Sequence, residues 1–125
     1  PDVRNYMAMA DFFIGKPGPG CLSEAVQQGL PVITFRNAWT MPQERCNTDW
    51  VRERGVGLVV RSLRALPQAV PALLEDLDRY RAATAAVTNR AVFEVPQIIE
   101  DLLVASRAGR PSQALASRVA TLAQA

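Results

Sequence analysis

The chain has 125 residues, which suits one domain of ordinary size. Hydrophobic residues make up 49% and charged residues 21%, the balance of a folded globular protein and not of a disordered one. A formal net charge of only +2 argues against a nucleic-acid partner, and no apolar run reaches the ~18–20 residues of a membrane-spanning helix.

Short apolar segments alternate with helical segments in the first half of the chain. Strands are predicted where short runs are mainly apolar, over residues 11–14, 31–35 and 57–60. Helices are predicted where apolar residues recur at helical spacing, ending over residues 6–10 and spanning 21–29 and 43–54. Loops are predicted over 36–43 and over 16–20, where two prolines and two glycines argue against any regular element.

The second half of the chain is predicted to be helical. One amphipathic helix covers 66–77, residues 80–87 extend or restart it, and Pro96 suits the first turn of another helix. Residues 109–112 separate an alanine-rich tail. The pattern predicts an α/β fold: part of a Rossmann-like, doubly wound parallel sheet of about three strands, followed by several C-terminal helices.

The chain begins at Pro1, close to helix-like sequence, as a segment of a longer protein would. We expect further strands of the sheet before Pro1, a partial domain over residues 1–108 and a helical tail over 109–125. A shortened sheet leaves an exposed edge, so strand 11–14 or the C-terminal helices are expected to pair with a second copy.

Two residue types limit the chemistry of the chain. No histidine is present, which removes the commonest general base and metal ligand. Cys21 and Cys46 are too few and too far apart for a zinc site, and without a recognisable export signal we expect two reduced thiols in a cytoplasmic protein. No metal and no cofactor are predicted.

The stretch from Gly15 to Glu24 is the most informative part of the sequence. A strand ends, a glycine-rich loop follows and a helix begins, which is where open α/β sheets bind ligands. Gly18 and Gly20 would let an anion approach the backbone, and the N–H groups of Gly20, Cys21 and Leu22 would hold phosphate oxygens. A tight turn without a ligand explains the same residues equally well.

Carboxylates and amides follow at the same edge of the predicted sheet. Glu24 either offsets the helix dipole or accepts hydrogen bonds from two ribose hydroxyls. Gln43 and Glu44 either begin a solvated helix or bind sugar hydroxyls. Lys16 is a charge at the edge of the loop or a contact to a distal phosphate.

Residues 10–47 resemble the nucleotide-sugar-binding domain of GT-B glycosyltransferases. The resemblance is carried by Ala10-Asp11-Phe12-Phe13-Ile14-Gly15-Lys16-Pro17-Gly18-Pro19-Gly20-Cys21-Leu22-Ser23-Glu24-Ala25, by Gly29-Leu30-Pro31, and by Pro42-Gln43-Glu44 with Asn47. Within this family the sequence resembles the diacylglycerol galactosyl- and glucosyltransferases, and the N-acetylglucosaminyltransferase that makes lipid II belongs to the same group. The Gly-Pro-Gly form looks more like the galactolipid synthases.

The resemblance implies a UDP-sugar donor and a role for each matching residue. Backbone amides of Gly18, Pro19, Gly20 and Cys21 would hold the diphosphate, and Glu24 the ribose. Gln43 and Glu44 would contact the transferred sugar, with Lys16 and Asn47 in support. Cys21 departs from the family, which usually has threonine or serine there, so a hydroxyl-to-phosphate bond is in doubt.

The resemblance also implies an inverting, metal-independent transfer of a hexose (galactose, glucose or N-acetylglucosamine), most simply to a lipid acceptor. The general base and the acceptor site are expected in an N-terminal domain outside this chain. Two alternatives stay open: transfer of N-acetylglucosamine to a peptidoglycan or polysaccharide precursor, and a non-catalytic phosphate-binding module.

Three further patterns have plain structural explanations. Asp76-Leu77-Asp78 matches a metal-binding D-x-D pattern but lies in a helix with Leu73, Leu74 and Leu77 inward, so a solvated acidic face is preferred. A solvated face is also preferred for Arg52, Arg54, Arg61 and Arg64, with attraction to anionic lipid at the inner face of the cytoplasmic membrane as the alternative. Trp50 and Val51 are expected in the core, beside Cys46 on one side of their helix.

Overall fold

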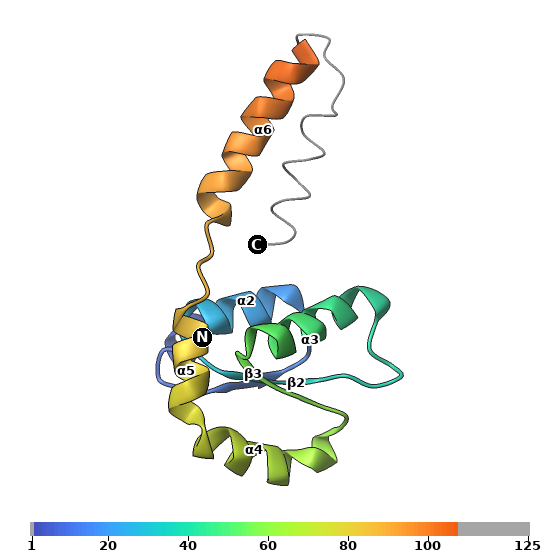
Figure 1. Cartoon of the computed structure of the whole chain (residues 1–125), viewed down its shortest axis with the longest axis vertical. Helices are drawn as coiled ribbons and strands as arrows, with labels where there is room; N and C mark the ends of the chain where they lie inside the picture. Colours follow the sequence, from blue (N-terminus) through green and yellow to red (C-terminus); the bar gives the residue numbers. More distant parts are fainter. Residues whose placement is uncertain (1, 108–125) are drawn as a thin grey trace. The chain divides into compact units, whose positions relative to one another are not determined.

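A computed structural model describes residues 2–107 of the chain (Figure 1). It divides into two compact units, Pro1–Thr88 and Asn89–Ala125, each described here by itself. The expected tail over 109–125 lies outside the described residues, so the predicted boundary at residue 108 stays a prediction.

The first unit is built on a parallel sheet of three strands, which confirms the predicted α/β fold. The strands are β1 (Phe13–Gly15), β2 (Val32–Phe35) and β3 (Gly57–Val60), in the order β1-β2-β3. Val32 lies opposite Phe13 on one side and opposite Gly57 on the other. β1 and β3 are therefore the two edges of the described sheet, and β2 is its buried centre.

Helices alternate with these strands and then follow them. The first unit contains α1 (Val3–Met7), α2 (Pro19–Gln27), α3 (Pro42–Arg54), the 3₁₀ turn η1 (Leu63–Ala65), α4 (Leu66–Glu75) and α5 (Leu77–Ala85). The second unit contains α6 (Ala91–Arg107). No helix among residues 2–107 combines the length and the apolar character that crossing a bilayer requires.

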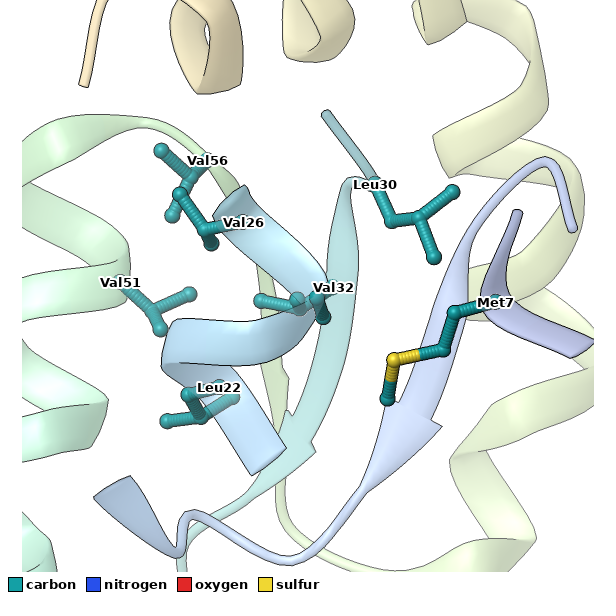
Figure 2. Packing of buried hydrophobic residues seen from close by; sticks show 8 residues of the cluster. Met7, Leu22, Val26, Leu30, Val32, Val51 and Val56 are labelled. Carbon is teal, nitrogen blue, oxygen red and sulfur yellow. The ribbon is translucent and has the colours of Figure 1, made fainter. Parts of the chain in front are cut away.

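The sheet is covered on both faces, as Figure 1 shows: α2 and α3 lie on one face and α4 on the other. Side chains of β2 alternate between the two layers, because successive strand residues point to opposite faces. Val32 packs beneath α2 and α3, and Ile33 packs against Leu73 and Tyr80 of the other layer. Figure 2 shows the first layer, formed by Met7, Leu22, Ala25, Val26, Leu30, Val32, Val51 and Val56.

The structure places Pro19 and Pro96 differently from the sequence prediction. Pro19 and Gly20 were expected in a loop but are the first residues of α2, because a proline at the first helical position lacks only an N–H that would have no acceptor there. Pro96 was expected in the first turn of a helix but lies inside α6, which begins at Ala91.

Several boundaries and faces also differ from the prediction. α1 ends at Met7 and not at Ala10, and β1 covers 13–15 and not 11–14. Cys46 is exposed, and Thr48 takes the buried position beside Val51 on α3. Leu74 is also exposed, so Leu73 is the inward residue at this point of α4.

Candidate functional site

The N-terminus of α2 is open and follows β1 directly. Gly18 is its N-cap and makes no side-chain capping bond, and Pro19 is the first helical residue. The N–H of Leu22 donates to the carbonyl oxygen of Gly18 at 3.2 Å. By helix geometry, the N–H groups of Gly18, Gly20 and Cys21 precede this bond and have no acceptor within the helix.

This geometry corrects two of the expected phosphate donors. Pro19 has no N–H and can donate nothing, so it only starts the helix. The N–H of Leu22 is already used inside α2. Gly18, Gly20 and Cys21 are therefore the donors that the chain leaves for an anion.

The fold itself does not require glycine at positions 18 and 20. The described glycines with positive φ are Gly29 and Gly55, so neither Gly18 nor Gly20 needs a conformation closed to other residues. A Cβ added at either position would meet no atom of the chain within 4 Å. The space that these glycines leave lies outside the protein, where a ligand would approach the backbone.

Side chains of the neighbouring elements hold the loop before α2 at two points. The buried Thr34 of β2 donates its hydroxyl to the carbonyl oxygen of Gly15 at 2.9 Å. The side-chain amide of Asn47 in α3 donates to the carbonyl oxygen of Pro17 at 2.7 Å. Pro17 itself is buried. The exposed Lys16 thus sits in a loop fixed on both sides.

Asn47→Ala is expected to weaken anion binding at α2 severalfold, because it frees the Pro17 carbonyl and loosens the loop. The stability cost should be about 1 kcal/mol, the usual net value of such a hydrogen bond. Urea unfolding and phosphate or UDP titration check both effects. Asn5→Ala, an exposed asparagine of α1, is the matched control and should change neither.

The remaining expected ligand residues are accessible to a ligand. Glu24 and Cys21 are exposed on α2, and Glu24 makes no ion pair with another described residue. Gln43 is exposed and Glu44 half-buried in the first turn of α3, where the N–H of Glu44 donates to the Met41 carbonyl oxygen at 2.9 Å. Both helices begin after the carboxyl end of a parallel strand. These residues therefore all lie beyond the carboxyl ends of the strands.

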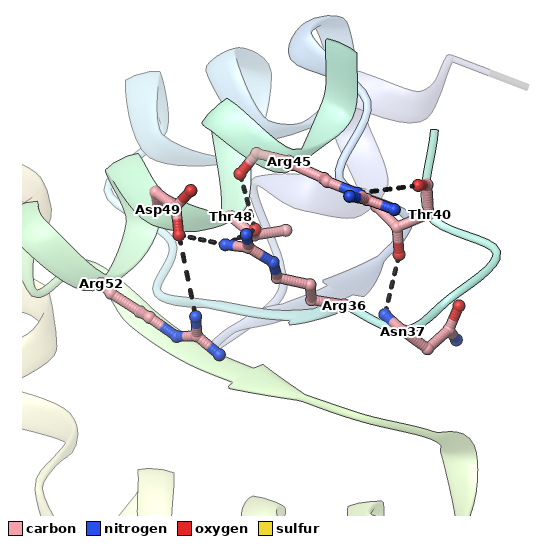
Figure 3. Close-up of polar contacts among 7 residues, drawn as sticks. All are labelled: Arg36, Asn37, Thr40, Arg45, Thr48, Asp49 and Arg52. Carbon is pink, nitrogen blue, oxygen red and sulfur yellow. Dashed lines mark hydrogen bonds and ion pairs between the residues drawn. The ribbon is translucent and has the colours of Figure 1, made fainter. Parts of the chain in front are cut away.

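A polar network that the sequence did not predict fastens α3 to the end of β2 (Figure 3). Arg36 donates to the buried hydroxyl of Thr48 at 3.3 Å and forms an ion pair with Asp49. Thr48 in turn donates to the carbonyl oxygen of Arg45 at 2.7 Å. The partners are 12 and 13 residues apart, so no short motif could have indicated them.

The other residues considered in the sequence analysis have structural explanations or form no site among the described residues. Asp76 pairs with Arg79 at 3.1 Å, and this hydrogen bond raises the pKa of Arg79. Within residues 2–107, no group of three or more histidine, cysteine or acidic side chains is placed to hold a metal ion. Cys21 and Cys46 are free thiols, and Trp50 is half-buried against the core as expected.

Comparison with known proteins gives consistent relatives. The chain is 34% identical over 68 residues to the monogalactosyldiacylglycerol synthase of Spinacia oleracea. This match covers 54% of the chain and 13% of that protein. It is 30% identical over 105 residues to a probable monogalactosyldiacylglycerol synthase 3 of Oryza sativa subsp. japonica, covering 80% and 20%. The processive diacylglycerol beta-glucosyltransferase of Bacillus subtilis is 28% identical over 103 residues, covering 81% and 26%.

The chain is thus a distant homologue of these lipid glycosyltransferases, which confirms the resemblance seen in the sequence. It spans between 12% and 26% of the length of the curated relatives that it matches. No protein-family model and no solved structure matches it.

Proposed function

We propose, from the chain's distant homology to lipid glycosyltransferases, that it is the UDP-sugar-binding portion of an inverting, metal-independent hexosyltransferase. The hexose is galactose, glucose or N-acetylglucosamine, and the acceptor is a lipid. The relatives' names, which specify synthesis of monogalactosyldiacylglycerol and glucosyl transfer to diacylglycerol, support the acceptor class.

One observation carries the donor-site proposal: two glycines that the fold does not need flank the first residue of an uncapped helix at the carboxyl end of a parallel strand. Helix N-termini favour anions through their free N–H groups and their dipole. Gly18, Gly20 and Cys21 would hold the diphosphate, with Pro19 setting the helix start and Lys16 near the distal phosphate. The loop is already fixed by Thr34 and Asn47, so little ordering is required on binding.

Side chains beyond the carboxyl ends of β1 and β2 would hold the ribose and the sugar of the donor. Glu24 lies a little more than one turn into α2, where its carboxylate would accept hydrogen bonds from both ribose hydroxyls. Gln43 and Glu44, in the first turn of α3, would bind hydroxyls of the transferred sugar. Asn47 acts as a positioning residue, because it contacts the loop.

The proposed transfer step is the one that the resemblance to inverting glycosyltransferases implies. The acceptor hydroxyl oxygen attacks the anomeric carbon from the face opposite UDP, which inverts that centre and gives its proton to a general base. The bond from the anomeric carbon to the diphosphate oxygen breaks, and its electron pair leaves on UDP. The N–H groups at the start of α2 stabilise the charge that develops there.

The general base of this reaction is assigned to a part of the whole enzyme outside this chain. Histidine is absent from all 125 residues, and the carboxylates at the site are assigned to the donor's hydroxyl groups. We therefore expect the chain alone to bind donor without transferring sugar. Turnover of a UDP-hexose onto a diacylglycerol acceptor by the purified chain would contradict this assignment.

Glu24→Ala is expected to remove UDP binding, because the ribose hydroxyls lose a charged acceptor whose hydrogen bonds contribute about 1.5–3 kcal/mol. Isothermal calorimetry should show weak binding of UDP to the unaltered chain, unchanged by EDTA. Gln27→Ala, exposed one turn further along α2, is the matched control and should bind normally.

Two results would contradict the proposal. Unchanged UDP affinity in the Glu24→Ala variant would overturn the ribose assignment. Binding of inorganic phosphate without any preference for UDP would favour a simple phosphate-binding module over a glycosyltransferase donor site.

A further inference from the structure

Trp39 is the most exposed large apolar residue of the described chain. Its side chain is 93% exposed in the loop that joins β2 to α3. Single exposed apolar residues are common on proteins, but an almost fully exposed tryptophan leaves a large apolar area in water. Its surroundings therefore decide whether it is incidental.

Trp39 is held outward by an ordered turn. The N–H of Trp39 donates to the side-chain oxygen of Asn37 at 2.9 Å, and the N–H of Asn37 donates to the hydroxyl of Thr40 at 2.9 Å. Thr40 is buried, and Figure 3 shows its contact with Asn37 beside the network at the start of α3. The backbone that presents the indole is thus fixed while the indole itself contacts almost nothing.

The same asparagine ties this turn to the chain beyond β3. The side-chain amide nitrogen of Asn37 donates to the carbonyl oxygen of Arg61 at 3.3 Å. One amide group therefore bridges the backbones of Trp39 and Arg61. The two loops that leave the carboxyl ends of β2 and β3 meet at this point.

Both loops carry further exposed apolar and basic side chains. Met41 is 50% exposed and Leu63 is 69% exposed. Arg61 and Arg64 are exposed and form no ion pair with another described residue. We call this set the Trp39 patch, comprising Trp39, Met41, Arg61, Leu63 and Arg64.

The charges of the Trp39 patch differ from those of neighbouring arginines. Arg36 and Arg52 both approach Asp49, so their charge is partly compensated within the fold. No acidic residue lies within 36–41 or 61–65. The patch thus combines an interfacial indole, two flexible apolar side chains and two uncompensated guanidinium groups.

We propose that the Trp39 patch binds the surface of a lipid bilayer that contains anionic headgroups. Tryptophan favours the boundary between water and acyl chains, and arginines are attracted to the negative surface potential of anionic lipid. Tryptophan and arginine are also common in protein–protein interfaces, so the choice of a bilayer rests on the absence of any acidic residue in the two loops, which leaves their positive charge free for anionic headgroups. The proposal stands on the patch alone and adds to the proposed function a bilayer, where a lipid acceptor would reside.

Sedimentation with vesicles tests the proposal on the full chain. Binding is expected to vesicles that mix phosphatidylglycerol with phosphatidylcholine, to fall with added salt, and to be much weaker to phosphatidylcholine alone. Trp39→Ala should reduce the bound fraction strongly, and so should the double change Arg61→Gln with Arg64→Gln. Bound vesicles should also shift the tryptophan emission to shorter wavelength, and this shift should vanish in Trp39→Ala.

Matched controls come from the opposite edge of the sheet. Met9→Ala removes an apolar side chain that is 75% exposed before β1, and Arg4→Gln removes an exposed charge on α1; neither should alter vesicle binding. Glu24→Ala should also leave it unchanged, so failure of the donor-site proposal and failure of this one are distinguishable.

Equal vesicle binding by Trp39→Ala and the unaltered chain would overturn the proposal. A concentration-dependent oligomer that disappears in Trp39→Ala, without vesicle binding by either protein, would show that the patch joins two copies and would also overturn it.

Discussion

Gly57→Ala is expected to destabilise the first unit by about 3 kcal/mol or more, the upper part of the range for overpacked interiors. Gly57 begins β3 and lies directly opposite Val32 of the central strand. A Cβ at this position would overlap the carbonyl oxygen of Val32 and lie 2.7 Å from its carbonyl carbon and 2.8 Å from its nitrogen. These are backbone atoms of the buried strand, so relief requires moving the strands apart.

Urea unfolding followed by circular dichroism measures this effect. Gly15→Ala is the matched control, because the Cβ there would meet the ring of Phe13, a side chain that can move. We expect that variant to remain folded with a much smaller loss. A Gly57→Ala variant as stable as the unaltered chain would contradict the strand register described here.

Gly20→Ala is expected to weaken UDP binding about tenfold or more, the change expected when ~1.4 kcal/mol of contact free energy is lost. The new methyl group would stand in the open space before the start of α2, where the diphosphate is proposed to bind. The fold should not suffer: alanine favours a helix over glycine by roughly 0.5–1 kcal/mol, so stability should stay equal or rise.

In Gly20→Ala, weaker UDP binding together with equal or higher stability would distinguish a binding role of Gly20 from a structural one. Calorimetry with UDP and urea unfolding should be run on the same preparation, with Gln27→Ala as the control on α2. Loss of stability together with binding would show that Gly20 serves the fold. Unchanged binding in a stable Gly20→Ala variant would contradict the proposed diphosphate site.

The sheet and its helices could be predicted because their signals are local. The run Val32–Phe35 consists of β-branched and aromatic residues, which predict a strand buried on both faces. Gly55 ends α3 in the left-handed conformation expected of a helix C-cap. Leu22, Ala25 and Val26 recur at helical spacing and do face the core. Each of these features depends on a few adjacent residues.

Contacts between distant residues were not predictable from spacing. Thr34 looked like any β-branched strand residue, but its hydroxyl holds the loop before α2. The bond from Asn47 to Pro17 spans 30 residues, and the resemblance indicated only that Asn47 has a supporting role. No sequence pattern singles out Trp39, because its proposed role depends on its exposure in the folded chain.

In the candidate site, too, local sequence identified the residues but not all of their contacts. The motif predicts Pro19 among the phosphate donors, and this is wrong because proline has no N–H to donate. The donors that remain are backbone groups, whose direction depends on where α2 begins and not on side-chain identity. The donor proposed at Cys21 is its N–H, whose position in α2 does not depend on whether the side chain is a thiol or a hydroxyl.

The start of α2 is proposed to hold the diphosphate of a UDP-sugar. The most direct test is titration of the ¹⁵N-labelled chain with UDP while the backbone amide resonances are recorded. We predict that the amides of Gly18, Gly20 and Cys21 shift most, saturably and with one common Kd. Saturable shifts confined to other parts of the chain, or no shift at a large excess of UDP, would contradict the claim.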